Sequence, residues 1–103
     1  MKAVYILLGL KNQKLKTYVG ALFKSSPKTR LDQHFQEVKK NRKGYLNQWD
    51  QILGYGYLEK TNNPRKREKE LKRMNAKRKL LLCYFFSKTN FEFEDWIDQL
   101  EAM

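Results

Sequence analysis

The sequence predicts a mainly α protein, a small bundle of four or five helices forming a single basic helical domain over residues 1–103. In several segments the apolar residues recur every three or four positions, which is the spacing of an amphipathic helix. Glycine, proline and asparagine separate these segments, as expected where helices end. A chain of 103 residues has the length of one small domain.

The first helix is expected over residues 12–23, where apolar side chains repeat at helical spacing from Leu15 to Phe23. Gly20 lies inside this segment and would cost about 1 kcal/mol relative to alanine in a helix interior. Pro27 follows shortly after, and the residue before a proline avoids the helical conformation. The first helix is therefore expected to end before Pro27.

A second helix is predicted from an N-cap at Thr29 to about residue 41, with Phe35 on its buried side. Gly44 marks its end. A third helix is then predicted from Tyr45 to Leu53, because apolar residues again follow the helical period. Trp49 is the expected core residue of that third helix.

Asn63 and Pro64 form the clearest helix start in the chain, because asparagine is a good N-cap and proline fits the first helical position. One long helix is predicted from Pro64 to about Phe86. Its apolar end, residues 80–86, could instead be a short strand paired with residues 3–8, since a short apolar run fits either element. The helix is favoured, and a final helix is predicted around residues 93–100.

Charge is unevenly distributed along the chain. There are 22 Lys and Arg against 11 Asp and Glu, a formal net charge of +11. No acid precedes Asp32, residues 65–79 are rich in cations, and residues 91–103 carry acids and neither Lys nor Arg. A compact chain with this charge repels itself, and a polyanion would relieve that repulsion. Nucleic acid is the predicted partner, ahead of a membrane surface or an acidic protein.

The candidate nucleic-acid-binding residues come from charge and helical phase. On a helix starting at Pro64, Lys66, Lys69, Arg73 and Lys77 would lie near one face. Such a helix would follow the phosphate backbone without reading bases, so binding should tolerate sequence and weaken with salt. The full predicted set is Arg65, Lys66, Lys69, Lys72, Arg73, Lys77 and Arg78, together with Lys14 and Lys16.

The acidic C-terminal segment is expected to dock on other protein subunits through Trp96, Asp95 and Asp98. Most aromatic residues fall on predicted apolar faces and are assigned to the core, Phe35 and Phe85 among them. Tyrosines near glycines are the better candidates for stacking on bases, namely Tyr45, Tyr55 and Tyr57.

The sequence favours a protein that is not an enzyme and has neither a metal nor another cofactor. His34 is the only imidazole and lies beside a predicted apolar face, as an ordinary partly buried histidine does. Cys83 is the only cysteine, and its apolar neighbours should raise its pKa and keep the thiol unreactive. Four nitrogen or sulfur ligands for zinc are not available from these two residues. No apolar run reaches the roughly 20 residues of a membrane span, and a cytoplasmic location is expected.

Four features of the chain stand out as a layout: residues 5–10, the Ser25–Pro27 break, the basic helix from Pro64 and the closing segment 82–86. This layout resembles the small helical subunit of multi-subunit CRISPR effector complexes. The resemblance covers most of the chain as a layout and includes no diagnostic motif. It implies a basic helical bundle that steadies a guide-RNA-directed R-loop without catalysis, as part of antiviral defence.

Three classes of function therefore stay open. The first is a non-catalytic nucleic-acid-binding subunit of a ribonucleoprotein, either of the CRISPR kind or ribosomal or ribosome-associated. The second is a phage or plasmid-type regulator that binds a protein through its acidic C-terminal helix. The third is an organellar protein, because residues 1–31 are acid-free and amphipathic like a transit peptide. Composition does not choose between RNA and DNA, since that depends on sugar contacts.

Overall fold

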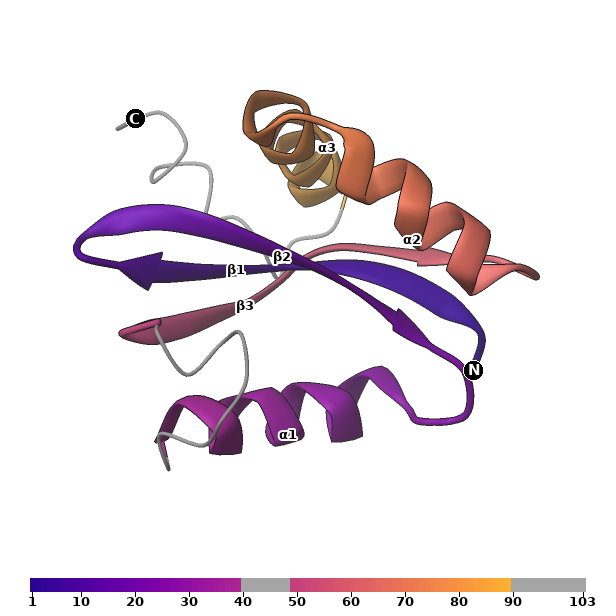
Figure 1. Cartoon of the computed structure of the whole chain (residues 1–103), viewed down its shortest axis with the longest axis horizontal. Helices are drawn as coiled ribbons and strands as arrows, with labels where there is room; N and C mark the ends of the chain where they lie inside the picture. The colour runs from indigo at the N-terminus through magenta and orange to yellow at the C-terminus, as the bar shows by residue number, and fades with distance from the viewer. Residues whose placement is uncertain (40–48, 90–103) are drawn as a thin grey trace.

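The computed structural model describes residues 1–39 and 49–89, which form an α+β fold. Three antiparallel strands form one sheet in the order β2-β1-β3. Helix α1 covers one face of the sheet, and α2 and α3 cover the other (Figure 1). The prediction of a mainly α bundle of four or five helices is therefore wrong. The elements are β1 (Ala3–Lys11), β2 (Lys14–Leu22), α1 (Pro27–Lys39), β3 (Gln51–Lys60), α2 (Pro64–Arg73) and α3 (Ala76–Thr89).

Strand β1 is the centre of the sheet and of the hydrophobic core. Every residue from Ala3 to Leu8 is fully buried, because helices cover both faces of the strand. A strand buried on both faces is continuously apolar instead of alternating, which explains the composition of this run. A strand at 3–8 is thus confirmed, but it pairs with β2 and β3 and not with residues 80–86.

The helix predicted over residues 12–23 is instead the second strand of a hairpin. Lys11 pairs with Lys14 across a two-residue turn, and both turn residues, Asn12 and Gln13, have positive φ. Two-residue hairpins favour such turns, because their twist matches that of the flanking strands. Gly20 then has a packing role: a Cβ there would collide with the hydroxyl oxygen of Tyr5, so only glycine leaves room for the Tyr5 ring.

The third predicted helix, Tyr45 to Leu53, is also wrong where the structure describes it. Strand β3 begins at Gln51 and runs through Gly54, whose φ of 135° suits only glycine. Residues 40–48, which include Tyr45, lie outside the described residues. Trp49 is buried as predicted, although it precedes a strand.

Helix α1 begins one turn earlier than predicted. The Ser26 hydroxyl oxygen accepts a hydrogen bond from the Thr29 backbone N–H at 3.1 Å, so Ser26 is the N-cap and Pro27 the first helical residue. The buried face of α1 includes His34, which is 1% exposed, whereas Phe35 is 41% exposed. The prediction that Phe35 belongs to the core is wrong, since the neighbouring position faces the sheet.

The predicted helix start at Pro64 is confirmed, because the Asn63 side chain accepts a hydrogen bond from the Lys66 N–H at 3.2 Å. A single helix from Pro64 to Phe86 is wrong, because Met74 is extended (φ −70°, ψ 144°) and ends α2. Asn75 then caps α3 by accepting from the Arg78 N–H at 2.9 Å. Residues 80–86 are helical as favoured. The final helix predicted around 93–100 lies outside the described residues.

Candidate nucleic-acid interface

The outward side of α2 carries a compact group of cations. Leu71 and Pro64 are buried and fix which side of the helix faces the sheet. With about 100° of rotation per residue, Lys66, Lys69 and Arg73 fall within about 60° of one another on the opposite side. Arg65 borders them, and all four side chains are exposed. We call Arg65, Lys66, Lys69 and Arg73 the α2 cationic face.

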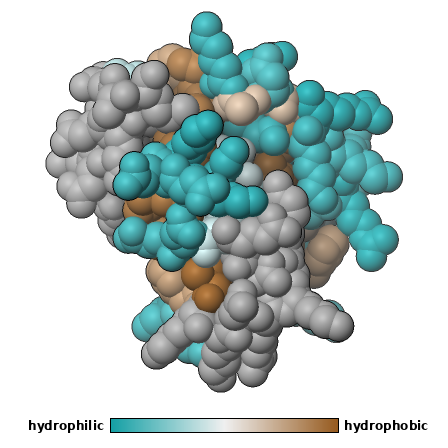
Figure 2. All heavy atoms as spheres, turned by 60° about the vertical axis from the view of Figure 1, so that its left-hand side comes forward, coloured by the Kyte–Doolittle hydropathy of each residue, from teal (hydrophilic) through white to brown (hydrophobic). Residues whose placement is uncertain are grey.

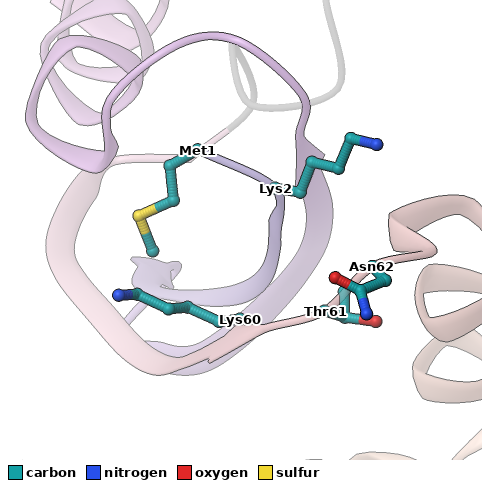
Figure 3. Close-up of a pocket in the computed structure, with 5 residues that line it drawn as sticks. All are labelled: Met1, Lys2, Lys60, Thr61 and Asn62. Atoms are coloured by element: carbon teal, nitrogen blue, oxygen red, sulfur yellow. The ribbon is translucent and has the colours of Figure 1, made fainter.

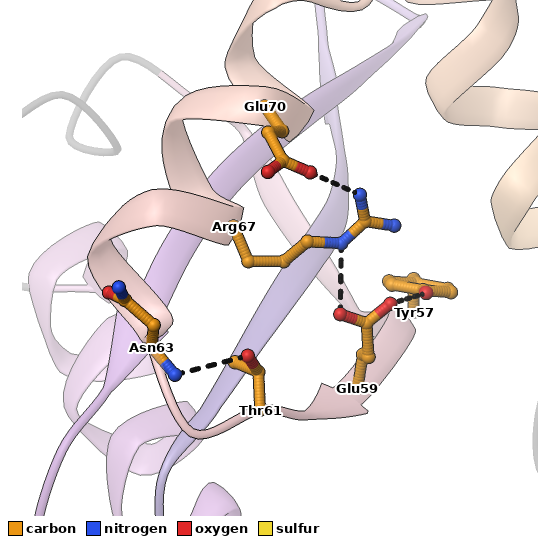
Figure 4. A network of polar contacts seen from close by, with 6 residues as sticks. All are labelled: Tyr57, Glu59, Thr61, Asn63, Arg67 and Glu70. Carbon is orange, nitrogen blue, oxygen red and sulfur yellow. Dashed lines mark hydrogen bonds and ion pairs between the residues drawn. The ribbon is translucent and has the colours of Figure 1, made fainter.

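The two acids of α2 are occupied by other cations. Arg67 donates to Glu70 at 2.9 Å and to Glu59 of β3, also at 2.9 Å, and Tyr57 donates to the same Glu59 carboxylate at 2.6 Å (Figure 4). The hydrogen bonds to Glu59 and Glu70 raise the pKa of Arg67 and hold it charged. Arg67 is therefore a structural residue that ties α2 to β3.

Lys72, which belongs to the predicted binding set, lies 3.4 Å from Glu68 and flanks the α2 cationic face. By contrast, Lys66, Lys69 and Arg73 form no ion pair with any residue that the structure describes. Their charges are therefore uncompensated and open to solvent. An extended anion is the ligand that such a row of cations fits best.

The predicted residues Lys77 and Arg78 are exposed but belong to α3. Figure 1 shows α2 and α3 running in clearly different directions. Lys77 therefore does not extend the row formed by Lys66, Lys69 and Arg73, as one continuous helix would require. The extended conformation of Met74 is the reason for this change of direction.

Lys14 and Lys16 lie on the other face of the sheet from α2. Side chains alternate along a strand, so both share a face with Tyr18. The centroids of the Tyr18 ring and of the His34 ring of α1 are 5.5 Å apart, which places this face of the sheet under α1. The structure thus separates Lys14 and Lys16 from the cations of α2, with which the prediction groups them. The separation results from the position of Lys14 and Lys16 on a strand of the sheet. The spacing of residues along a predicted helix cannot show it.

The surface over α2 and α3 is largely hydrophilic. Figure 2 shows hydrophilic residues over much of the upper part of the molecule, where these helices lie, with smaller apolar areas between them. Two of the apolar residues exposed on α3 are Phe85, 63% exposed, and Leu81, 45% exposed. The assignment of Phe85 to the core is therefore wrong. The predicted docking residues Trp96, Asp95 and Asp98 lie outside the described residues.

A cavity of about 370 Å³ lies where β1 begins and β3 leads into α2. Lys2, Lys60 and Asn62 line it, and the Thr61 N–H donates to the Lys2 carbonyl at 3.1 Å. Figure 3 shows the ammonium groups of Lys2 and Lys60 pointing away from each other. They add to the positive charge near the start of α2 without converging on one anion.

Of the three tyrosines expected to stack on bases, the structure describes Tyr55 and Tyr57. Tyr55 is buried and donates to the Pro27 carbonyl at 2.5 Å, and burial raises its pKa. Tyr57 is half-buried, donates to Glu59 and packs against Phe86 with ring centroids 5.7 Å apart. The buried Tyr55 ring therefore offers no free face of the kind that base stacking needs. Tyr45 lies outside the described residues.

His34 belongs to a polar cluster between the sheet and α1. Its Nε2 is 2.7 Å from the Tyr5 hydroxyl, and Arg30 Nε donates to the same hydroxyl at 3.4 Å. Its Nδ1 makes no hydrogen bond within the described residues and lies 3.5 Å from a Glu37 oxygen. Burial raises the pKa of Tyr5 to about 12, while burial and the Arg30 charge lower that of His34. Because Tyr5 and His34 are enclosed, their groups are not placed to touch a substrate.

This cluster predicts a pH dependence of stability. The lowered pKa of His34 means that the unfolded chain takes up a proton near pH 6.5, before the folded chain does. Stability from the neutral imidazole is therefore present above about pH 6.5 and is lost as pH falls below it, with a slope of up to about 1.4 kcal/mol per pH unit. Urea unfolding at pH 7.5 and 5.5 should show this loss. The His34→Gln variant should have a lower free energy of unfolding at pH 7.5, and that free energy should change less between pH 7.5 and pH 5.5. An unchanged pH dependence in the variant would exclude His34 as its source.

The remaining candidate chemistry is limited. Cys83 is buried, and burial raises its pKa to about 12, so the expected effect of its apolar surroundings is confirmed. In residues 1–39 and 49–89, no group of three or more His, Cys, Asp or Glu residues could hold a metal ion. No helix in those same ranges is long and apolar enough to cross a membrane.

Comparison of the chain with protein-family models, curated proteins and solved structures finds no significant match. These comparisons leave the resemblance to a CRISPR small subunit untested. The all-helical architecture which that resemblance implies is nevertheless not the fold of this chain, because a three-stranded sheet forms its centre.

Proposed function

We propose that this chain is a non-catalytic nucleic-acid-binding subunit of a ribonucleoprotein assembly. One observation carries the proposal: Lys66, Lys69 and Arg73 point outward together on α2, while both acids of that helix pair with other cations. Phosphate groups would supply the missing negative charge. Arginine can bind two phosphate oxygens at once, and lysine acts as a point charge.

The length of α2 sets the size of the contact. Ten helical residues span about 15 Å, and the four exposed cations of the α2 cationic face can neutralise about four phosphates. This row of cations is shorter than the row that an unbroken helix from Pro64 would provide. Lysine and arginine contacts to phosphates carry no sequence information, so binding through this face should tolerate any sequence.

Salt dependence tests the proposal on the unmodified protein. Four phosphate contacts predict that the logarithm of the binding constant falls against the logarithm of salt concentration with a slope of about −3 to −4. Fluorescence anisotropy with labelled 20-nucleotide RNA, single-stranded DNA and duplex DNA between 50 and 200 mM salt measures that slope. Binding to none of them at 50 mM salt, or binding that does not change with salt, would contradict the proposal.

Docking on a neighbouring protein subunit is the second part of the proposed function. Leu81 and Phe85 are one turn apart on the outward side of α3, with Lys77 and Arg78 exposed beside them. An apolar area bordered by cations fits a protein surface that is apolar and acidic. Phe85→Glu should release the protein subunit that copurifies with the chain and leave nucleic-acid binding unchanged. An assembly unaffected by Phe85→Glu would contradict docking at this face.

A CRISPR effector complex and the ribosome are the two assemblies that this proposal names, and a cytoplasmic location fits both. The proteins and the nucleic acid that copurify with the native chain distinguish them. A guide RNA with effector subunits would support the first, and ribosomal RNA the second. Recovery of a basic protein partner without nucleic acid would instead favour the regulator class.

A further inference from the structure

A second group of residues lies where the α2 cationic face meets the edge of the sheet. Arg65, the first cation of that face, lies over the ring of Phe23, with the guanidinium carbon 5.6 Å from the ring centroid. Phe23 follows the last residue of β2, which is an edge strand. The ring is 45% exposed, although a side chain of this size is usually well covered.

Phe23 also lines a cavity of about 340 Å³ between the end of β2 and α1. This volume lies near the lower end of the range of about 300–1,000 Å³ that is usual for small-ligand sites. The polar residues that line the cavity are Lys24, Ser25, Arg30 and Gln33. The cavity therefore combines an accessible aromatic ring with two cations, a hydroxyl and an amide.

Arg30 is held in a fixed position at this cavity. Its Nε donates to the Tyr5 hydroxyl at 3.4 Å, and its Nη1 donates to Gln33 at 2.9 Å. Its remaining terminal nitrogen, Nη2, has no hydrogen-bond partner among the residues that the structure describes. An arginine fixed by two of its nitrogens, with the third free, is prepared to bind a phosphate oxygen.

We propose that the Phe23 cavity binds one nucleotide of a single-stranded nucleic acid, with the base on the Phe23 ring and the phosphate at Lys24 and Arg30. This inference rests on the proposed function and names the form of nucleic acid that is preferred. Bases inside a duplex stack on each other and cannot reach a side chain, whereas an unpaired base can stack on an aromatic ring. The strand would continue past Arg65 onto the α2 cationic face.

Replacing the ring tests this inference. Phe23→Leu keeps an apolar side chain but removes the aromatic face, and the absence of one stacked base should weaken binding on the order of 10-fold. Binding of the full-length variant is measured with labelled 20-nucleotide U-only RNA, T-only DNA and a 20-base-pair duplex at one salt concentration. We expect the weakening for the single strands and no change for the duplex. Equal weakening on duplex and single strand would show that Phe23 only positions Arg65 and would overturn the inference.

Phe35→Leu is the matched control, because Phe35 is also exposed but is not part of the cavity. It should leave all three affinities unchanged, and both variants should show the wild-type unfolding midpoint. Unchanged single-strand binding by Phe23→Leu, in a protein that still binds through salt-sensitive contacts, would overturn this inference alone. A wild-type protein that binds none of the three probes would overturn the proposed function as well.

Discussion

Reversing the charges of Lys66, Lys69 and Arg73 to glutamate is expected to weaken nucleic-acid binding by at least about 100-fold. Each substitution removes a charge-assisted hydrogen bond to phosphate worth about 1 kcal/mol or more, and each glutamate repels phosphate. The slope of the logarithm of the binding constant against the logarithm of salt concentration should also become shallower by about three, one for each phosphate that is no longer neutralised. Anisotropy titrations of the triple variant against the wild type measure both quantities.

The control for this variant has the same change in charge on the opposite side of the sheet. Lys14 and Lys16 share the α1 face, and Lys28 is an exposed residue of α1 itself. Reversing these three to glutamate should reduce affinity much less, through long-range repulsion that salt screens. If the two triple variants lose equal affinity, the net charge of the protein governs binding and the arrangement of cations on α2 does not. That result would contradict the assignment of the α2 cationic face as the binding site.

Leu71→Ala is expected to have the largest effect on stability, a loss of about 2–5 kcal/mol in the free energy of unfolding. Leu71 is fully buried and is the apolar anchor of a helix whose other side chains are mostly charged. Truncation removes buried apolar contacts and leaves a cavity beneath α2. Because a small domain is stable by only about 5–15 kcal/mol, this is a substantial part of the total.

Urea unfolding monitored by circular dichroism measures the loss, and Leu81→Ala is its matched control. Leu81 is half exposed on α3, so the same truncation there should cost less than about 1 kcal/mol. Equal costs for the two variants would show that α2 is not anchored through Leu71.

The capped start of α2 can be predicted from the sequence because its signals are local. Asn63 and Pro64 define that start, and the spacing of Lys66, Lys69 and Arg73 places them on one side of any helix that begins there. The break at Met74 has a local signal too, since Asn75 is a good N-cap. That signal is easily overlooked because the apolar residues on both sides of Asn75 fit one continuous helix.

Strand β2 shows why the sheet is harder to predict. From Leu15 to Leu22, the same apolar residues fit both a helical period and a strand whose two faces are partly covered. In the structure, Asn12 and Gln13 form the hairpin turn that makes this segment a strand, and both have positive φ angles. Neither residue is the glycine that would indicate such a turn in the sequence. Gly20 is a weak point in a helix, whereas in the strand it accommodates the ring of Tyr5.

The rest of the candidate site depends on contacts between distant residues. The pairing of Arg67 with Glu59 requires β3 to lie beside α2, and only that pairing distinguishes Arg67 from its free neighbours. The Phe23 cavity likewise brings together the end of β2 and α1, and Arg65 from the first turn of α2 lies over the Phe23 ring. The spacing of residues along a helix predicts neither the Arg67–Glu59 pair nor the Phe23 cavity, because the order of the strands determines which elements lie side by side.

Acetylation of lysines in the wild-type protein, read by mass spectrometry with and without a bound 20-nucleotide single strand, tests the central claim most directly. Lys66 and Lys69 are exposed in the free protein and should be protected in the complex, while Lys14, Lys16 and Lys28 should react equally in both. Protection of Lys14 and Lys16 with Lys66 and Lys69 still reactive would place the strand on the other face of the sheet. That result would contradict the assignment of α2 as the nucleic-acid-binding element.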